Sequence, residues 1–280
     1  MNHLLRSVAP ISDAGWELLD DEARQRLTPA LAARKLVDFS GPHGWEHSAT
    51  NLGRTGSLER PTIVEGVTGL QRRVLPVVEL RADFELARAE LRDADRGADD
   101  ADLEALGRAA HQIAQAENVA VFHGWPGATV GIAAASPYER TQLGDDPSAY
   151  PNKVAAAVEQ LLASGIDGPY GLALGREPYR RVAETAEHGG YPLLNHLKEI
   201  TAGPIVWAPG VNGAIVLSLR GGDFVFDCGQ DLSIGYDSHD RDAVHLYVEE
   251  SFSFHVATPE AAVALFGVPA RRARSRRPAA

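Results

Sequence analysis

The sequence predicts an α+β protein. Helical and strand patterns are mixed along the chain, and from Pro204 onward four strand patterns follow one another. A doubly wound parallel sheet would instead show strands and helices in regular alternation. With 280 residues, 44% of them hydrophobic and 23% charged, the chain can bury a substantial core as one large domain or two interlocked ones.

The first elements expected are two helices. Residues 12–27 have a suitable N-cap in Ser12, and Ile11 and Trp16 stand at the spacing of a hydrophobic staple. A second helix is expected to begin at Thr28, because Thr is a good N-cap and the proline that follows fits the first helical position.

A long extended arm is expected next. Residues 40–66 are rich in Gly, Pro, Ser and Thr and contain few large apolar residues, so the segment has little to bury. Excursions of this length are uncommon in compact monomers and are usually functional or bound to a partner. The sequence therefore indicates an arm that contacts a neighbouring molecule.

The middle of the chain contains the helix with the clearest pattern. Strand character at residues 67–81 is followed by an expected helix through Phe84, Ala87 and Leu91, and residues 95–102 form a turn. The long helix after this turn has an apolar stripe at positions i, i+3, i+7 and i+10, made by Leu103, Leu106, Ala110 and Ile113.

The remaining elements are shorter. Helices are expected over residues 154–162, 176–188 and 192–202, and the glycines between the last two can adopt positive φ in a tight, exposed loop. Strands are expected at residues 170–175, 204–209, 213–221, 222–236 and 242–259. Ordered structure is expected to end near Phe266.

Composition limits the compartment and the partners. A single cysteine cannot form an internal disulfide, which favours the cytoplasm. No apolar run approaches the roughly 20 residues that cross a bilayer, and the N-terminus becomes polar too soon for a secretory signal, so neither membrane nor export is expected.

The net charge of −11 is unevenly distributed, because residues 271–277 hold five arginines and the rest of the chain is more acidic still. An acidic body disfavours nucleic acid as the main partner. The basic tail is expected to be disordered and solvated, with contact to an acidic neighbour as the alternative.

The only cysteine lies in "GGDFVFDCGQDLSIGY", residues 221–236. Strand alternation places Cys228 on one face with Phe224 and Phe226. A reactive thiolate needs a cationic setting, and the aspartates on either side have the opposite effect. The pattern favours a buried structural cysteine over a nucleophile.

No metal site and no catalytic motif are predicted. His43 and His47 have a spacing that binds zinc on a helix, but the Pro and Gly around them disfavour a helix, so contact with another subunit is the favoured role. The aspartates near residue 240 lack the spacing of a calcium loop and fit a polar hairpin turn. Phosphate-binding, dinucleotide-binding, nucleophile-elbow and zinc-protease motifs are absent from the sequence.

The order of several segments is similar to that of a known family. The segments "LLRSVAPISDAGWELLDDEA", "LAARKLVDFSGPHGWE", "NLGR", "GGDFVFDCGQDLSIGY" and "DAVHLYVEESFSFHVATPEAAVAL" resemble encapsulin shell proteins, also called linocin or bacteriocin-like proteins. The resemblance runs almost end to end and leaves out only the arginine-rich tail.

The resemblance implies an HK97 phage capsid-like fold and assembly of identical subunits into a closed icosahedral shell, with the smallest icosahedral class expected. It implies N-terminal helices of a peripheral domain and an extended loop that lies on the neighbouring subunit. The N-terminal helices would occupy residues 1–39 and the extended loop residues 40–75. The peripheral part at residues 76–129 would contain a spine helix at residues 102–118, and the axial domain would follow at residues 130–220. Further peripheral strands at residues 221–267 and a disordered basic tail at residues 268–280 would complete the subunit.

The resemblance also implies that the shell encloses a cargo enzyme, typically a dye-decolourising peroxidase or a ferritin-like protein, which carries a C-terminal targeting peptide. The positions that match the peptide-binding site are Arg34, Asp38, Leu232 and Ile234. Two of these are apolar and two can form charged hydrogen bonds that fix the register of a peptide. The shell subunit itself is not an enzyme, and no cofactor is expected: residues 85–97, which match a flavin-binding stretch of some members, hold no Trp or Tyr.

Loops of the axial domain form pores at the fivefold axes in this family. The matching loop here contains Glu187, His188, Gly189, Gly190 and Tyr191. A ring of His188 side chains would change charge near about pH 6.5, and a glycine-rich connection with an incidental histidine is the alternative. The competing functions are a viral-type capsid subunit that holds nucleic acid and a stand-alone hydrolase or bacteriocin.

Overall fold

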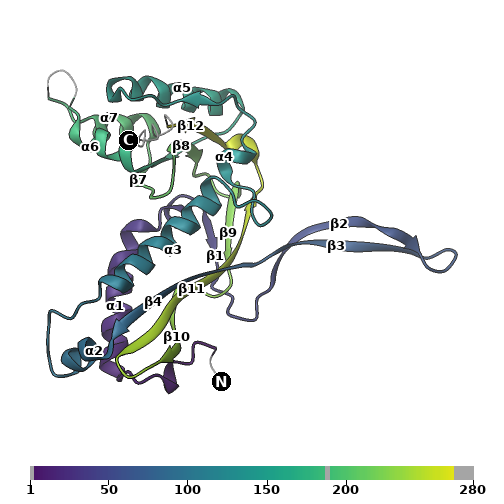
Figure 1. The fold of residues 1–280 in the computed structure, drawn as a ribbon. Coiled ribbons are helices and arrows are strands. Elements are labelled where there is room, and N and C mark those ends of the chain that lie inside the picture. The colour runs from purple at the N-terminus through teal and green to yellow at the C-terminus, as the bar shows by residue number, and fades with distance from the viewer. Residues whose placement is uncertain (1–2, 187–189, 268–280) are drawn as a thin grey trace, which may run out of the picture.

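The computed structural model describes residues 3–186 and 190–267, and Figure 1 shows their arrangement. The strands of these residues form two sheets and a separate hairpin. The helices are α1 (Asp13–Ala30), α2 (Arg88–Asp95), α3 (Glu104–Phe122), α4 (Ile132–Ala135), α5 (Tyr150–Ala163), α6 (Arg176–Glu184) and α7 (Leu193–Thr201), with 3-10 turns η1 (Arg6–Val8), η2 (Ala33–Lys35), η3 (Pro147–Ala149) and η4 (Pro259–Ala261). The strands are β1 (Asp38–Ser40), β2 (Ala49–Thr62), β3 (Thr68–Pro76), β4 (Val78–Ala87), β5 (Thr141–Gln142), β6 (Tyr170–Leu174), β7 (Ile205–Trp207), β8 (Gly213–Ser218), β9 (Phe224–Cys228), β10 (Ser233–His239), β11 (Ala243–Val256) and β12 (Ala262–Phe266).

The first sheet is built around the long strand β11. Its order is β1-β9-β11-β10, and β4 pairs with the N-terminal part of β11 in antiparallel register. Helices α1 and α3 lie side by side next to this sheet (Figure 1). Leu106 and Ile113 of α3 join Leu19 of α1 and Leu246 of β11 in one buried core. The apolar stripe expected for the long helix is thereby confirmed.

The second sheet has the order β5-β12-β8-β6-β7, with α5, α6 and α7 beside it (Figure 1). Leu161 of α5, Leu197 of α7 and Val216 of β8 are fully buried in its core. The same core continues into the first sheet through Phe226 and Phe252, whose rings stack with centroids 4.6 Å apart. The two sheets are therefore joined by a common core.

The hairpin of β2 and β3 projects far from the body, as Figure 1 shows. The side chain of Ile63 at its end is 93% exposed, and Val64, Val67 and Leu70 are exposed as well. An isolated two-stranded hairpin is marginally stable in water, and clustered exposed apolar residues mark interaction surfaces. This is the extended arm expected from the sequence, and its own strands leave its apolar side chains uncovered.

Two helix predictions are wrong. Helix α1 continues through Thr28, whose hydroxyl donates to the carbonyl oxygen of Arg24 at 2.6 Å, so no second helix begins there. Phe84 lies in β4 opposite Leu246 of β11, and the helix begins only at Arg88. In the second case pairing with a long strand prevails over a local helical spacing, because strand preference depends on the neighbouring strands. Among the described residues no helix is both long and apolar enough to cross a bilayer.

Candidate functional site

A groove of about 240 Å³ runs between α1 and the start of β10. Its apolar lining comes from both elements and from the neighbouring strand β11: Ala23, Leu27, Leu31, Leu232, Ile234 and Val248. Helix α1 supplies its share because positions 23, 27 and 31 recur every four residues on one helical face. Charged side chains border the same groove, namely Asp20, Arg24, Arg34 and Asp231.

Three of the four predicted peptide-binding residues meet in this groove. Leu232 is partly exposed and follows Asp231, whose Oδ1 accepts the Leu232 backbone N–H at 2.8 Å. The side chain of Ile234 is almost completely buried at 2% exposure, so it forms part of the floor of the groove and not of its rim. Arg34 reaches the groove from η2, immediately after α1.

Arg34 is tied to three carboxylates that come from different parts of the chain. Its Nε donates to Glu117 Oε2 of α3 at 2.6 Å, its Nη1 to Asp231 Oδ1 at 2.6 Å and its Nη2 to Glu250 Oε2 of β11 at 2.7 Å. We call these four residues the Arg34 cluster. Burial opposes the charged guanidinium, but the carboxylates outweigh it and raise the pKa of Arg34 above its ordinary value. The side chains of Glu117 and Glu250 are wholly buried, whereas that of Asp231 is 44% exposed.

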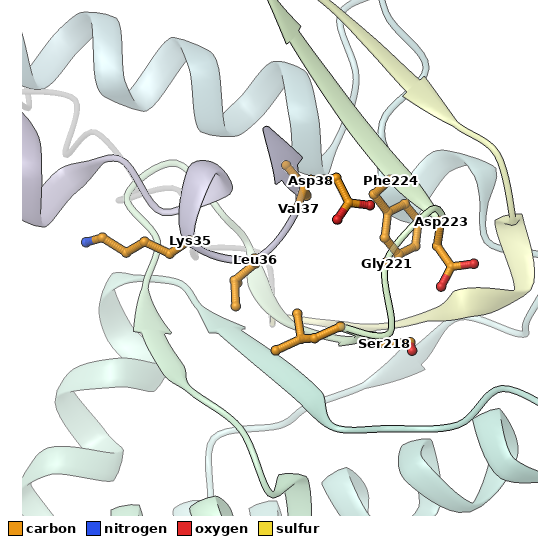
Figure 2. Close-up of a pocket in the computed structure, with 9 residues that line it drawn as sticks. Lys35, Leu36, Val37, Asp38, Ser218, Gly221, Asp223 and Phe224 are labelled. Atoms are coloured by element: carbon orange, nitrogen blue, oxygen red, sulfur yellow. The ribbon is translucent and has the colours of Figure 1, made fainter. Parts of the chain in front are cut away.

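Asp38 is not brought to the groove. It lines a separate pocket of about 200 Å³ between the η2–β1 segment and the β8–β9 connection, which Figure 2 shows. Its Oδ2 accepts the backbone N–H of Gly222 at 2.6 Å. Gly222 has φ of 81°, a left-handed conformation that favours glycine. In the same view Lys35 points away from the carboxylates of Asp38 and Asp223. Asp38 therefore stabilises the turn between β8 and β9.

The predicted pore loop lies only partly within the described residues. Glu187, His188 and Gly189 are outside them. Gly190 has φ of 81°, and Tyr191 is 41% exposed, with its hydroxyl donating to Glu199 Oε1 of α7 at 2.6 Å.

The other candidates from the sequence have structural roles in this chain. Cys228 is fully buried in the shared core, and burial, with Asp231 adding to it, raises the pKa of its thiol to about 12. His43 and His47 both bind the carboxylate of Asp227 on β9, at 2.7 and 3.1 Å, and Thr50 of β2 binds it too. These contacts fix the root of the arm within its own subunit. Among the described residues no group of three or more ligating side chains is suited to a metal ion.

Sequence reasoning missed Glu117 and Glu250, although both carry a signal. Glu117 continues the apolar stripe of α3 four positions after Ile113. Glu250 falls on the buried face of β11, two positions from Val248 and from Phe252. A carboxylate on the buried face of a helix or strand requires a cationic or hydrogen-bonding partner. Glutamates at positions where the pattern predicts burial could therefore have indicated this pair.

The solved structures that resemble this fold include a virus-like particle and a phage capsid. The chain is similar to a virus-like particle from Pyrococcus furiosus with a TM-score of 0.64, at 20% identity over 89% of this chain and 98% of that one. It is similar to the Mycobacterium phage Ogopogo chain with a TM-score of 0.53, at 14% identity over 86% of this chain and 92% of that one. The fold is therefore of the HK97 phage capsid-like class.

Sequence comparison gives the family. The profile of the family described as "Encapsulating protein for peroxidase" matches residues 1–253. The type 1 encapsulin shell protein of Rhodospirillum rubrum is 47% identical over 273 residues, which cover 96% of this chain and 98% of that protein. The type 1 encapsulin shell protein of Mycobacterium tuberculosis is 40% identical over 266 residues, 95% of this chain and 99% of that protein. The chain belongs to the encapsulin shell protein family.

Membership settles the broad role. Relatives that match nearly end to end are named shell proteins, so this chain is a structural subunit that assembles into a capsid-like shell and is not an enzyme. The stand-alone hydrolase alternative is thereby removed.

Proposed function

We propose that the shell built by this chain encloses a cargo enzyme, and that the groove between α1 and β10 receives a short peptide of that cargo. The observation that carries the proposal is the convergence of Arg34, Leu232 and Ile234 on one groove, although nearly 200 residues separate the first from the other two. The family description refers to encapsulation of a peroxidase, so a peroxidase is the first cargo to test and a ferritin-like protein the second.

The chemistry of the groove suits an extended peptide with apolar side chains. Leu27 and Ile234 supply a buried apolar floor, and Leu232 offers a partly exposed contact. The carboxylate of Asp231 stands at the rim, with Oδ1 held by Arg34. Three nitrogen atoms of Arg34 already bind carboxylates, so Arg34 acts mainly by positioning Asp231. Buried apolar anchors surrounded by fixed polar groups are the usual source of affinity in such sites.

Co-expression with a tagged cargo tests the groove. The shell is produced together with a peroxidase that carries a C-terminal targeting peptide, and the particles are purified by size. Leu232→Asp places a charge on the apolar contact, and we expect intact particles with at least about tenfold less cargo, since loss of one buried leucine contact is worth about 1.5–3 kcal/mol.

Asp38→Asn is the matched control, because Asp38 was expected to bind the peptide but lines the other pocket. Its particles should keep their cargo. Full cargo loading in Leu232→Asp particles would refute the groove as the docking site.

The alternative function is a capsid subunit that holds nucleic acid. The ratio of absorbance at about 260 nm to that at about 280 nm would reveal particles filled with nucleic acid, and the acidic body of the chain argues against them.

The connection between α6 and α7 remains the proposed pore loop, and the cytoplasm the proposed location. Support for the pore comes from the resemblance and from the exposure of Tyr191. His188→Ala shells that admit a small peroxidase substrate with unchanged rate and unchanged pH dependence would remove the gating role of His188.

A further inference from the structure

Glu117 and Glu250 form a buried pair, and neither residue lines the groove. Each uses Oε2 to bind Arg34, and in each the other oxygen, Oε1, is buried without a hydrogen-bond partner. Both carboxylates bind the guanidinium of the same arginine, one at Nε and the other at Nη2, so the two buried carboxyl groups lie close together. Two carboxylates have only acceptor atoms, so two such groups in contact need a proton to form a hydrogen bond.

The charges around the pair also favour a proton on one of the two carboxyl groups. The charged or titratable groups that face it are Arg34 from η2, Asp231 from the β9–β10 connection and Cys228 from β9. One cation thus stands against three carboxyl groups, and the thiol is neutral. Burial raises the pKa of both Glu117 and Glu250, and repulsion from Glu117 raises that of Glu250 further.

We propose that Glu117 and Glu250 share one proton at neutral pH, and that this proton acts as a latch which holds the floor of the groove together. The pair joins α3 to β11, and through Arg34 it joins both to η2 and to Asp231, which precedes the groove residue Leu232. Loss of the proton in alkaline solution leaves two adjacent carboxylates in a site closed to water. Their repulsion loosens the floor and releases what the groove holds. In this last respect the inference rests on the proposed function.

The direction of the pH effect follows from linkage. The folded chain binds one more proton than the unfolded chain at every pH between the ordinary Glu value and the raised value of the pair. The stability that this pair contributes is therefore fully present below the ordinary Glu value and falls as the pH rises through this window, by about tenfold in the unfolding equilibrium per pH unit for one proton. Above the raised value no further loss arises from this source.

Infrared spectroscopy of assembled wild-type shells tests the shared proton directly. A protonated carboxyl has a carbonyl stretching band that a carboxylate lacks, and we expect such a band at neutral pH that disappears in alkaline solution. Glu250→Gln replaces the shared proton by a fixed amide donor and should remove the band, as should Glu117→Gln. Glu85→Gln, at an exposed carboxyl on β4, is the matched control and should leave it. Absence of the band in wild-type shells overturns the proposal without any variant.

Cys228 reports on the opening itself, because it is the chain's only cysteine and is fully buried beside the pair. Its alkylation by iodoacetamide is followed from neutral to alkaline pH. Thiolate formation alone increases the rate at most tenfold per pH unit, and we expect wild-type shells to exceed this and Glu250→Gln shells to follow it. Identical profiles in the two proteins would overturn the latch.

Neither measurement requires a peptide, so the two proposals fail separately. Cargo retained in Leu232→Asp particles refutes the groove and leaves the infrared band in place. A missing band together with lost cargo in that variant refutes only the latch.

Discussion

Arg34 Nε lies 2.6 Å from Glu117 Oε2, and the side chain of Glu117 is completely buried. This ion pair connects the segment that follows α1 to the middle of α3. Removing one partner of a buried pair leaves an uncompensated charge, which typically costs about 3–5 kcal/mol. The pair therefore matters more for the fold than for direct contact with a peptide.

Arg34→Ala is accordingly expected to lower the stability of the subunit by about 3–5 kcal/mol, measured as a shift of the denaturation midpoint of purified shells. Arg24→Ala removes an exposed arginine from the same groove and should change the midpoint little. If Arg34→Ala shells denature like the wild type, the Arg34 cluster does not hold the fold. Cargo loss in Arg34→Ala alone would not identify a peptide contact, since the groove itself would be altered.

Asn118 gives a second test of the junction between α1 and α3. Its Oδ1 accepts the backbone N–H groups of Ala32 and Ala33, both at 3.0 Å, and its Nδ2 donates to the carbonyl oxygens of Ala30 and Pro209. Asn118→Leu keeps the volume but leaves these groups without a partner, at about 1–3 kcal/mol for each buried one.

We expect Asn118→Leu to lose at least about 2 kcal/mol in denaturant unfolding. Gln115→Leu makes a similar change on the exposed face of the same helix and should be nearly neutral. An equal effect of the two substitutions would show that the four hydrogen bonds of Asn118 do not stabilise the junction.

Local patterns predict the parts of this fold that repeat within one element. The apolar stripe of α3 and the alternation around Cys228 both follow from helical and strand periods, and both agree with the structure. The Arg34 cluster and the contacts of His43 with Asp227 join residues far apart in sequence, so only the tertiary fold brings them together. The helix expected around Phe84 failed for the same reason, because β11 supplies a partner that no local window contains.

The carboxyl of Asp227 makes the stability of the arm root depend on pH in the acidic range. Burial alone would raise the pKa of this carboxyl, but hydrogen bonds from Thr50, His43 and the neighbouring side chains lower it below the ordinary Asp value. The folded chain thus holds fewer protons here than the unfolded chain. The stability from this site is present above about pH 4 and is lost as the pH falls through the lowered value.

Hydrogen exchange at the arm root measures this effect. The backbone N–H groups of His43 and Gly44 donate to the carbonyl oxygens of Cys228 and Gly229, both at 2.9 Å. In the wild type we expect their protection to decrease in acid beyond the intrinsic change in exchange rate. In Asp227→Asn it should already be low at neutral pH. Asp237→Asn, at an exposed carboxyl, is the control. Protection in Asp227→Asn that equals the wild type at neutral pH contradicts the role of Asp227.

The exposed apolar side chains of the β2–β3 arm are expected to contact the neighbouring subunit in the shell. Leu70→Asp places a charge on a residue that is 60% exposed in the single chain. If assembly buries this side chain, the substitution opposes burial worth about 1.5–3 kcal/mol per copy, more than tenfold in association. Sedimentation should then show mostly unassembled subunits with unchanged circular dichroism. Gln71→Asp adds the same charge to the adjacent position, whose side chain points to the opposite face of the hairpin, and should still assemble. Normal particles from Leu70→Asp would mean that this side of the arm stays exposed in the shell.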